Sequence, residues 1–178
     1  GAVVYGGNSD SLVVSALYGV LVTLLLFLCV TLHEFGHAYA VRIADGEVHE
    51  MGIMFLVFMP VPYVDASAAS AFRDRRKRML VGAAGILVEL FLASIALFVW
   101  LNVEPGIVHA MAYNIMLIGG VSTVLFNGNP LLRYDGYYVL SDLVDVPNLA
   151  EKSRTLLSAH LSRLLLGIDE LPSEPQAT

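Results

Sequence analysis

The sequence predicts an all-α membrane protein with three transmembrane helices and a short membrane-associated β-strand or hairpin after the first helix. Three observations predict this fold class. Of the 178 residues, 57% are hydrophobic and only 15% are charged, whereas a soluble domain of this size carries more surface charge. Three separate segments each contain the ~20 apolar residues that a helix needs to cross a bilayer. A further apolar segment, between the first two, is too short to cross and is rich in strand-forming residues.

The three spans are predicted at residues 11–41, 79–101 and 107–126. The first includes an apolar stretch from Leu12 to Val30 that contains no charged residue. Only residues 102–106 separate the second span from the third. Because this connection is so short, we expect these two helices to be antiparallel neighbours.

Basic residues gather on one side of the predicted spans. They are Arg42, Arg73, Arg75, Arg76, Lys77 and Arg78 between the first two spans, and Arg133, Lys152 and Arg154 after the third. The opposite side has the acidic residues Asp10 and Glu104 and no lysine or arginine. The positive-inside rule then predicts that the N-terminus lies outside and that residues 42–78 lie in the cytoplasm.

Residues 48–65 do not resemble an ordinary cytoplasmic loop. We expect a strand or hairpin that dips back toward the end of the first span, with Pro60 and Pro62 ending the strand. Irregular backbone at membrane depth must be covered by protein or line a wet cavity. An interfacial helix is the alternative interpretation of this segment.

The last part of the chain is predicted to lie at the membrane interface, on the cytoplasmic face. Residues 135–142 favour a short helix or turn, and a second helix is expected to start near Asn148. Its leucines form an apolar stripe, which favours an interfacial amphipathic helix, followed by a disordered tail. We therefore divide the chain into a core, residues 1–147, and a peripheral segment, residues 148–178. The missing initiator methionine leads us to expect a fragment of a longer protein.

The cytoplasmic end of the first span contains the sequence His-Glu-Phe-Gly-His. On a helix, His33 and His37 are one turn apart and face the same way, with Glu34 beside them. Zinc hydrolases use this pattern, with two imidazoles as metal ligands and the carboxylate as general base. Because the motif lies in or near lipid, it suggests proteolysis inside the membrane.

A catalytic zinc site also needs a third protein ligand, with water in the fourth position. The extended metzincin motif fails here, because its third histidine would fall at Ile43. Three acids remain as candidates for the third ligand: Glu50, Glu89 and Asp135. Glu89 lies in the middle of the second span, where an ionisable group is costly. It could instead accept a hydrogen bond from a zinc-bound imidazole, or pin the second span to the first as a protonated acid.

The segment that follows the third span supplies a second motif. Asn127, Pro130, Asp135 and Gly136 fit the pattern N-x-x-P-x-x-x-x-D-G. With the histidine motif, this pattern resembles the site-2 protease family of intramembrane zinc metalloproteases. The resemblance covers roughly residues 11–147, and the second motif is similar to a bacterial branch of peptide zinc metalloproteases. Many family members have a second glycine where this chain has Tyr137, so we expect the local geometry to differ.

The resemblance implies a metalloprotease core with one Zn²⁺ per chain, held by His33, His37 and Asp135. It also implies that Asn127 and Pro130 help to hold the substrate strand. Glu34 would activate the attacking water. The expected reaction is hydrolysis of peptide bonds in membrane-spanning or membrane-associated peptides, by an integral protein of the bacterial plasma membrane with its active site toward the cytoplasm.

The expected partners are the peptide substrate, the lipid bilayer, and other parts of a longer chain or partner proteins; no nucleic acid is expected. Because a transmembrane substrate must unwind before cleavage, the strand at residues 48–59 could pair with it by β-augmentation.

Two alternative functions stay open. One is a membrane metal-binding or transport protein, since histidines and acids in spans also mark ion pathways. The other is a catalytically inactive scaffold of the same fold.

Overall fold

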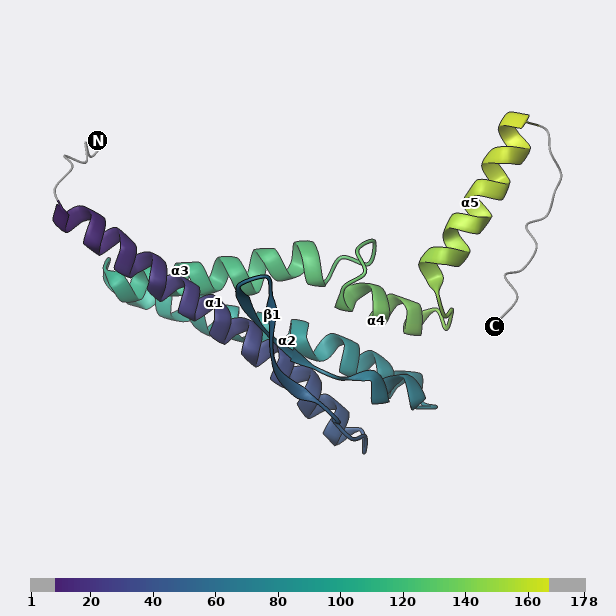
Figure 1. Ribbon diagram of the computed structural model, residues 1–178, viewed down its shortest axis with the longest axis horizontal. Helices are drawn as coiled ribbons and strands as arrows, with labels where there is room; N and C mark the ends of the chain where they lie inside the picture. Colours follow the sequence, from purple (N-terminus) through teal and green to yellow (C-terminus); the bar gives the residue numbers. More distant parts are fainter. Residues whose placement is uncertain (1–8, 167–178) are drawn as a thin grey trace.

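Three long helices form the body of the protein. The computed structural model describes residues 9–166, and Figure 1 shows the helix axes roughly aligned, with α2 running opposite to α1 and α3. They are α1 (Ser9–Ile43), α2 (Arg75–Asn102), and α3 (Ile107–Met116) continued by a π-helix (Leu117–Asn127). All three are long and apolar enough to cross a membrane. The predicted fold class is confirmed.

The second helix begins earlier than the apolar pattern predicts. Asp74 lies before its first turn, and the carboxylate accepts a hydrogen bond from the Arg76 backbone N–H at 2.9 Å. An N-cap of this kind satisfies a backbone donor that would otherwise be unpaired at the helix start. The basic residues that follow therefore extend the helix beyond the apolar segment predicted at residues 79–101.

Small side chains hold the C-terminal half of α1 against the N-terminal half of α2. Ala40 and Val41 of α1 form a buried cluster with Val81 and Ala84 of α2. In lipid, where helices gain little from hydrophobic association, small residues allow the close van der Waals contact that holds a bundle together. The N-terminal half of α1 is apolar and exposed from Leu12 on, as expected for a surface that faces lipid.

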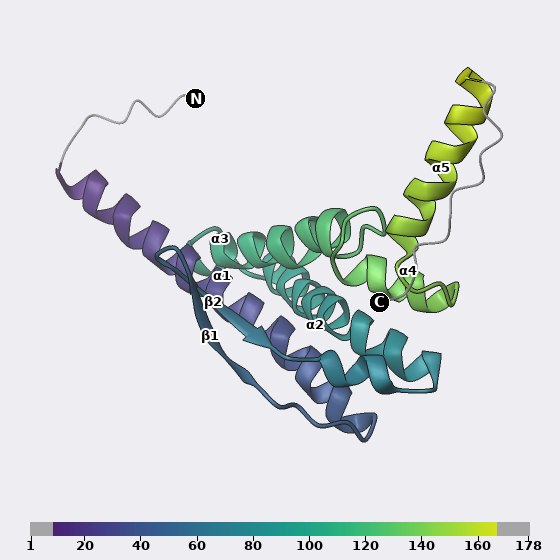
Figure 2. The same cartoon turned by 45° about the vertical axis from the view of Figure 1, so that its right-hand side comes forward.

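A β-hairpin follows the first helix, as predicted. Strand β1 (Met51–Leu56) pairs antiparallel with β2 (Met59–Val64) in the register Met51↔Val64 to Leu56↔Met59. Figure 2 shows β2 between β1 and α1, and β2 is the strand that packs on α1. The hairpin excludes the interfacial helix as an interpretation of this segment.

The prediction that Pro60 and Pro62 end the strand is wrong, because both lie inside β2. The Asp65 N–H donates to the Glu50 carbonyl at 2.9 Å, which fixes which cross-strand pairs form hydrogen bonds. By alternation from that pair, both prolines occupy positions whose backbone nitrogen faces away from β1. A missing N–H there costs no bond of the ladder, so the hairpin accommodates both residues.

A 3₁₀-helix, η1 (Ser67–Ala71), lies between the hairpin and α2. Two shorter helices follow the three long ones and complete the described chain. Helix α4 (Asp135–Leu143) packs on α2, whereas α5 (Leu149–Leu166) points away from the three long helices (Figures 1 and 2). Several leucines of α5 are exposed. The division of the chain at residue 147, the interfacial position of α5 and the orientation across the membrane stay predictions. The predicted disordered tail lies outside the described residues.

Candidate metal centre

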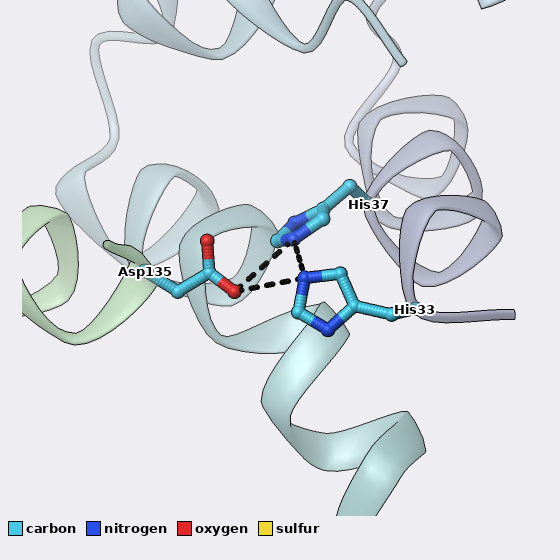
Figure 3. Close-up of side chains that lie close together, drawn as sticks. All are labelled: His33, His37 and Asp135. Carbon is cyan, nitrogen blue, oxygen red and sulfur yellow. Dashed lines mark hydrogen bonds and ion pairs between the residues drawn. The ribbon is translucent and has the colours of Figure 1, made fainter. Parts of the chain in front are cut away.

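Two distant parts of the chain meet near the C-terminal end of α1. His33 and His37 project from α1, and Asp135 projects from the first turn of α4 (Figure 3). Asp135 Oδ2 lies 3.1 Å from His33 Nε2 and 3.3 Å from His37 Nε2, and the two Nε2 atoms lie 3.1 Å apart. The three side chains therefore direct one potential ligand atom each at a common point.

These separations fit a zinc ion. Ligand atoms bonded at ~2.0–2.1 Å to a tetrahedral zinc lie roughly 3.3 Å from one another. Asp135 Oδ2 is buried and has no hydrogen-bond donor among the described residues. A buried carboxylate oxygen without a donor is costly unless a cation compensates it. The donor set of two imidazoles and one carboxylate is also one that catalytic zinc sites use.

Asp135 is in the ionised form that a metal ligand needs. Burial acts to raise the pKa of this carboxyl group, but the contacts with His33 and His37 outweigh it and lower the pKa to about 2. At neutral pH the side chain is therefore a carboxylate, the form that binds a metal.

His37 is held in a defined orientation by the backbone of α2. Its Nδ1 lies 2.7 Å from the Val81 carbonyl oxygen, which can only accept, so Nδ1 donates the hydrogen bond. In the neutral imidazole this leaves the lone pair on Nε2, the atom that faces His33 and Asp135. The hydrogen bond thus selects the tautomer that can bind a metal through Nε2.

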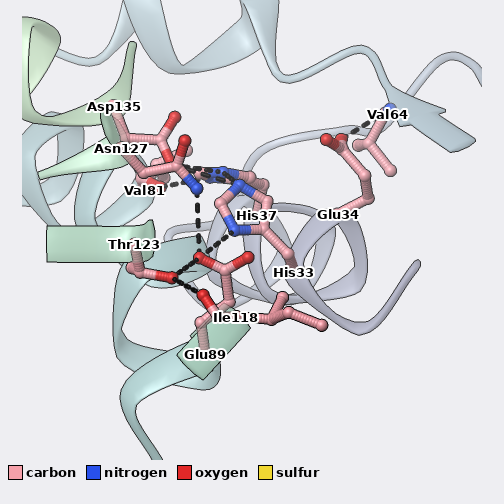
Figure 4. Close-up of polar contacts among 10 residues, drawn as sticks. All are labelled: His33, Glu34, His37, Val64, Val81, Glu89, Ile118, Thr123, Asn127 and Asp135. Carbon is pink, nitrogen blue, oxygen red and sulfur yellow. Dashed lines mark hydrogen bonds and ion pairs between the residues drawn. The ribbon is translucent and has the colours of Figure 1, made fainter. Parts of the chain in front are cut away.

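Glu89 lies on the opposite side of His33 from Asp135. One carboxylate oxygen of Glu89 is 3.2 Å from His33 Nδ1, although the contact is not a well-directed hydrogen bond. The same oxygen accepts hydrogen bonds from Thr123 Oγ1 at 2.6 Å and from Asn127 Nδ2 at 3.0 Å (Figure 4). Thr123 is almost completely buried. Glu89 therefore faces the ring nitrogen of His33 that points away from the candidate metal position.

Glu34 faces the same region from α1 and is tied to the hairpin. Its Oε2 accepts the Val64 N–H at 3.0 Å (Figure 4), so the inner edge of β2 contacts the helix that carries the histidines. A cavity of about 890 Å³ joins Glu34, the two histidines and Asp135, and it extends to Asn148, the residue before α5. The cavity is large enough for water and part of a peptide to reach Glu34, the two histidines and Asp135.

The model of peptidase family M50 matches residues 21–171, a range that contains both sequence motifs. The chain belongs to peptidase family M50, the site-2 protease family. The resemblance drawn from the two motifs is thus confirmed. No curated protein and no solved structure matches the chain. Family M50 membership and the three apolar helices together indicate an integral membrane protein of the site-2 metalloprotease class.

The other predicted site residues of this M50 member do not join the group of potential ligand atoms. Glu50 is exposed at the base of the hairpin, so of the three acids only Asp135 joins the two Nε2 atoms. Asn127 donates to Glu89, and Pro130 lies exposed in the turn before α4. Their predicted contact with substrate stays a prediction.

Several groups that shape the candidate metal centre were not predicted from the sequence. Thr123 reads as an ordinary polar residue of a span, and the Val81 carbonyl and Val64 N–H have no sequence signature at all. Gly85 of α2 is a further such residue. In the structure its α-carbon faces the histidines, and a Cβ built on it would lie 2.6 Å from His37 Nε2 and would also clash with His33. The lack of a side chain at Gly85 gives the two imidazoles their space.

Proposed function

We propose that this M50 member is a zinc-dependent intramembrane endopeptidase that hydrolyses membrane-spanning or membrane-associated peptides. The convergence of His33, His37 and Asp135 beside Glu34, in a cavity lined by two of the apolar helices, α1 and α2, together with α4, carries the proposal. The decisive experiment is cleavage of a membrane-spanning peptide by the purified protein, with Glu34 intact or replaced by glutamine.

The side chains divide the reaction among them. His33, His37 and Asp135 would hold one zinc ion, which supplies Lewis-acid activation of water and of the peptide carbonyl group. Glu34 takes the proton from the attacking water and delivers it to the amine that leaves. In the absence of substrate, the hydrogen bond from the Val64 N–H holds the Glu34 carboxylate beside the cavity.

We assign Glu89 the role of orienting His33 rather than binding the metal. It approaches Nδ1, whereas Asp135 approaches Nε2, and metal-bound imidazoles usually donate their second N–H to such an acceptor. The hydrogen bonds from Thr123 and Asn127 keep the carboxylate of Glu89 in this position. In this arrangement the amide of Asn127 supports the metal centre through Glu89.

Glu89→Gln is expected to weaken zinc binding by about 10- to 100-fold, the usual cost of losing such a partner. The amide is a weaker acceptor for the His33 N–H, while its shape is nearly unchanged. Competition with a fluorescent zinc chelator measures the effect, and Glu104→Gln, an exposed acid between α2 and α3, is the control. Unchanged zinc affinity in Glu89→Gln would remove Glu89 from the metal centre.

We further propose that an extended part of the substrate pairs with the outer edge of β1. Alternation from the Glu50–Asp65 pair places the N–H groups of Met51, Ile53 and Phe55 on that edge, facing away from β2. An open sheet edge does not persist in hydrocarbon unless something pairs with it. The inner edge is unsuitable, because it contains both prolines. Since β2 separates β1 from α1, the paired segment would flank the scissile bond rather than contain it.

Ile53→Pro is expected to reduce cleavage at least about tenfold, because it removes one outward N–H while every hairpin hydrogen bond remains. Zinc content should not change. Ile53→Ala is the matched control, since it shortens the side chain but keeps the N–H. Equal cleavage by the two variants would show that this edge does not bind substrate.

A further inference from the structure

A second polar cluster lies in the wall of the same cavity, at the start of α2. The guanidinium group of Arg78 contacts Asp142 Oδ1 through Nε at 2.6 Å and Asp145 Oδ1 through Nη2 at 3.2 Å. It also donates from Nη1 to the Phe72 carbonyl at 2.9 Å. The Arg78 side chain is only 19% exposed and that of Asp142 25% exposed, so this pair is better shielded from water than an ordinary surface ion pair.

The ion pair lies at one end of an antiparallel contact between α2 and α4. Asp135 and Asp142 are seven residues apart, or about two helical turns, so both face α2. Arg78 and Gly85 have the same spacing on α2, and Gly85 lies against the imidazoles that Asp135 contacts. Between the two ends, a Cβ on Gly82 would be 3.1 Å from Val139 Cγ2, so the helices pack very closely.

We propose that Arg78 is a positioning residue whose ion pair with Asp142 and Asp145 fixes the register of α4 on α2 and thereby holds Asp135 at the histidine pair. The inference rests on the proposed function, in which Asp135 is a zinc ligand. Helix α4 has only nine residues and follows an irregular turn, residues 128–134. A helix of that length is marginal alone, so its contacts decide where it lies.

The proposal predicts that Arg78→Gln weakens zinc binding by about tenfold, the lower end of what supporting residues of a metal site cost. Lys77→Gln is the matched control. It removes the same charge from the adjacent residue, whose amino group contacts Asp45 Oδ2 at 3.2 Å and the Ala44 carbonyl at 3.0 Å, both just beyond the end of α1 and away from α4. Competition with a fluorescent zinc chelator, on the folded full-length protein in nanodiscs, gives both affinities.

Three further results separate positioning from a general loss of stability. A purely structural role would lower the folded fraction but leave the zinc affinity of the folded protein unchanged, which would overturn the proposal. Positioning predicts that saturating zinc restores cleavage by Arg78→Gln. It also predicts that adding Asp142→Asn to Arg78→Gln weakens zinc binding no further, because both act through one ion pair; a fully additive loss would contradict this.

Hydrogen exchange of the metal-free protein provides a test that does not depend on the proposed function. The α4 amides should exchange faster in Arg78→Gln than in Lys77→Gln, even if the wild-type protein neither binds zinc nor cleaves peptides. If the wild-type protein does not bind zinc, only the endopeptidase proposal is refuted. Equal α4 exchange in the two variants would refute the positioning role of Arg78 alone.

Discussion

Glu34→Gln is expected to lower the rate of peptide cleavage by about a thousandfold or more, while zinc stays bound. A positioned general base contributes about 10²- to 10⁴-fold, and an amide cannot take the proton from water. Glutamine has nearly the same shape as glutamate, and its side-chain oxygen can still accept the Val64 N–H. The hairpin should therefore keep its contact with α1. Cleavage of membrane-spanning peptides in nanodiscs, alongside the zinc content of the same samples, provides the measurement.

Glu50→Gln is the control for this substitution, because it makes the same chemical change at an exposed acid at the base of the hairpin. Its cleavage rate should equal that of the wild type. The comparison also separates the competing functions. A metal transporter would conduct equally well with either variant, and an inactive scaffold would bind zinc but cleave nothing even with Glu34 intact. Substantial cleavage by Glu34→Gln would show that another group is the base.

The sequence predicts the two candidate metal ligands that lie on a single helix, His33 and His37. His33 and His37 are four positions apart, and a helix places residues with this spacing on one face whatever surrounds it. The position of Asp135 depends instead on how α4 packs, so spacing alone left it level with Glu50 and Glu89. The resemblance to a family was needed to choose among the three acids.

The contacts that support the centre were beyond sequence reasoning for a different reason. Thr123 and Asn127 reach Glu89 from the π-helix, and the sequence contains no pattern that predicts this helix type. The error over Pro60 and Pro62 had a simpler cause. A proline disrupts a ladder only where its nitrogen faces the partner strand, and the pairing register decides that.

Gly85→Ala is the second substitution expected to have a large effect. Ala is the better helix former by about 1 kcal/mol, so helix propensity alone predicts a slightly more stable α2. The metal centre predicts the opposite outcome for function. A Cβ 2.6 Å from His37 Nε2 must be relieved to the ordinary contact distance of about 3.5 Å, so the ring has to retreat by roughly 1 Å.

A ligand displaced by that much cannot complete a zinc site, whose bond lengths vary by only about 0.2 Å. We therefore expect zinc affinity and cleavage to fall by at least about a hundredfold in Gly85→Ala, with no loss of thermal stability. Gly120→Ala is the matched control in the third span, because its Cβ would meet only the Ala93 methyl group at 3.8 Å. If Gly85→Ala binds zinc as tightly as Gly120→Ala, the imidazoles do not bind metal in the positions seen here. If both variants merely unfold, thermal melting will show it, and the more modest Glu89→Gln then remains the test of the same centre.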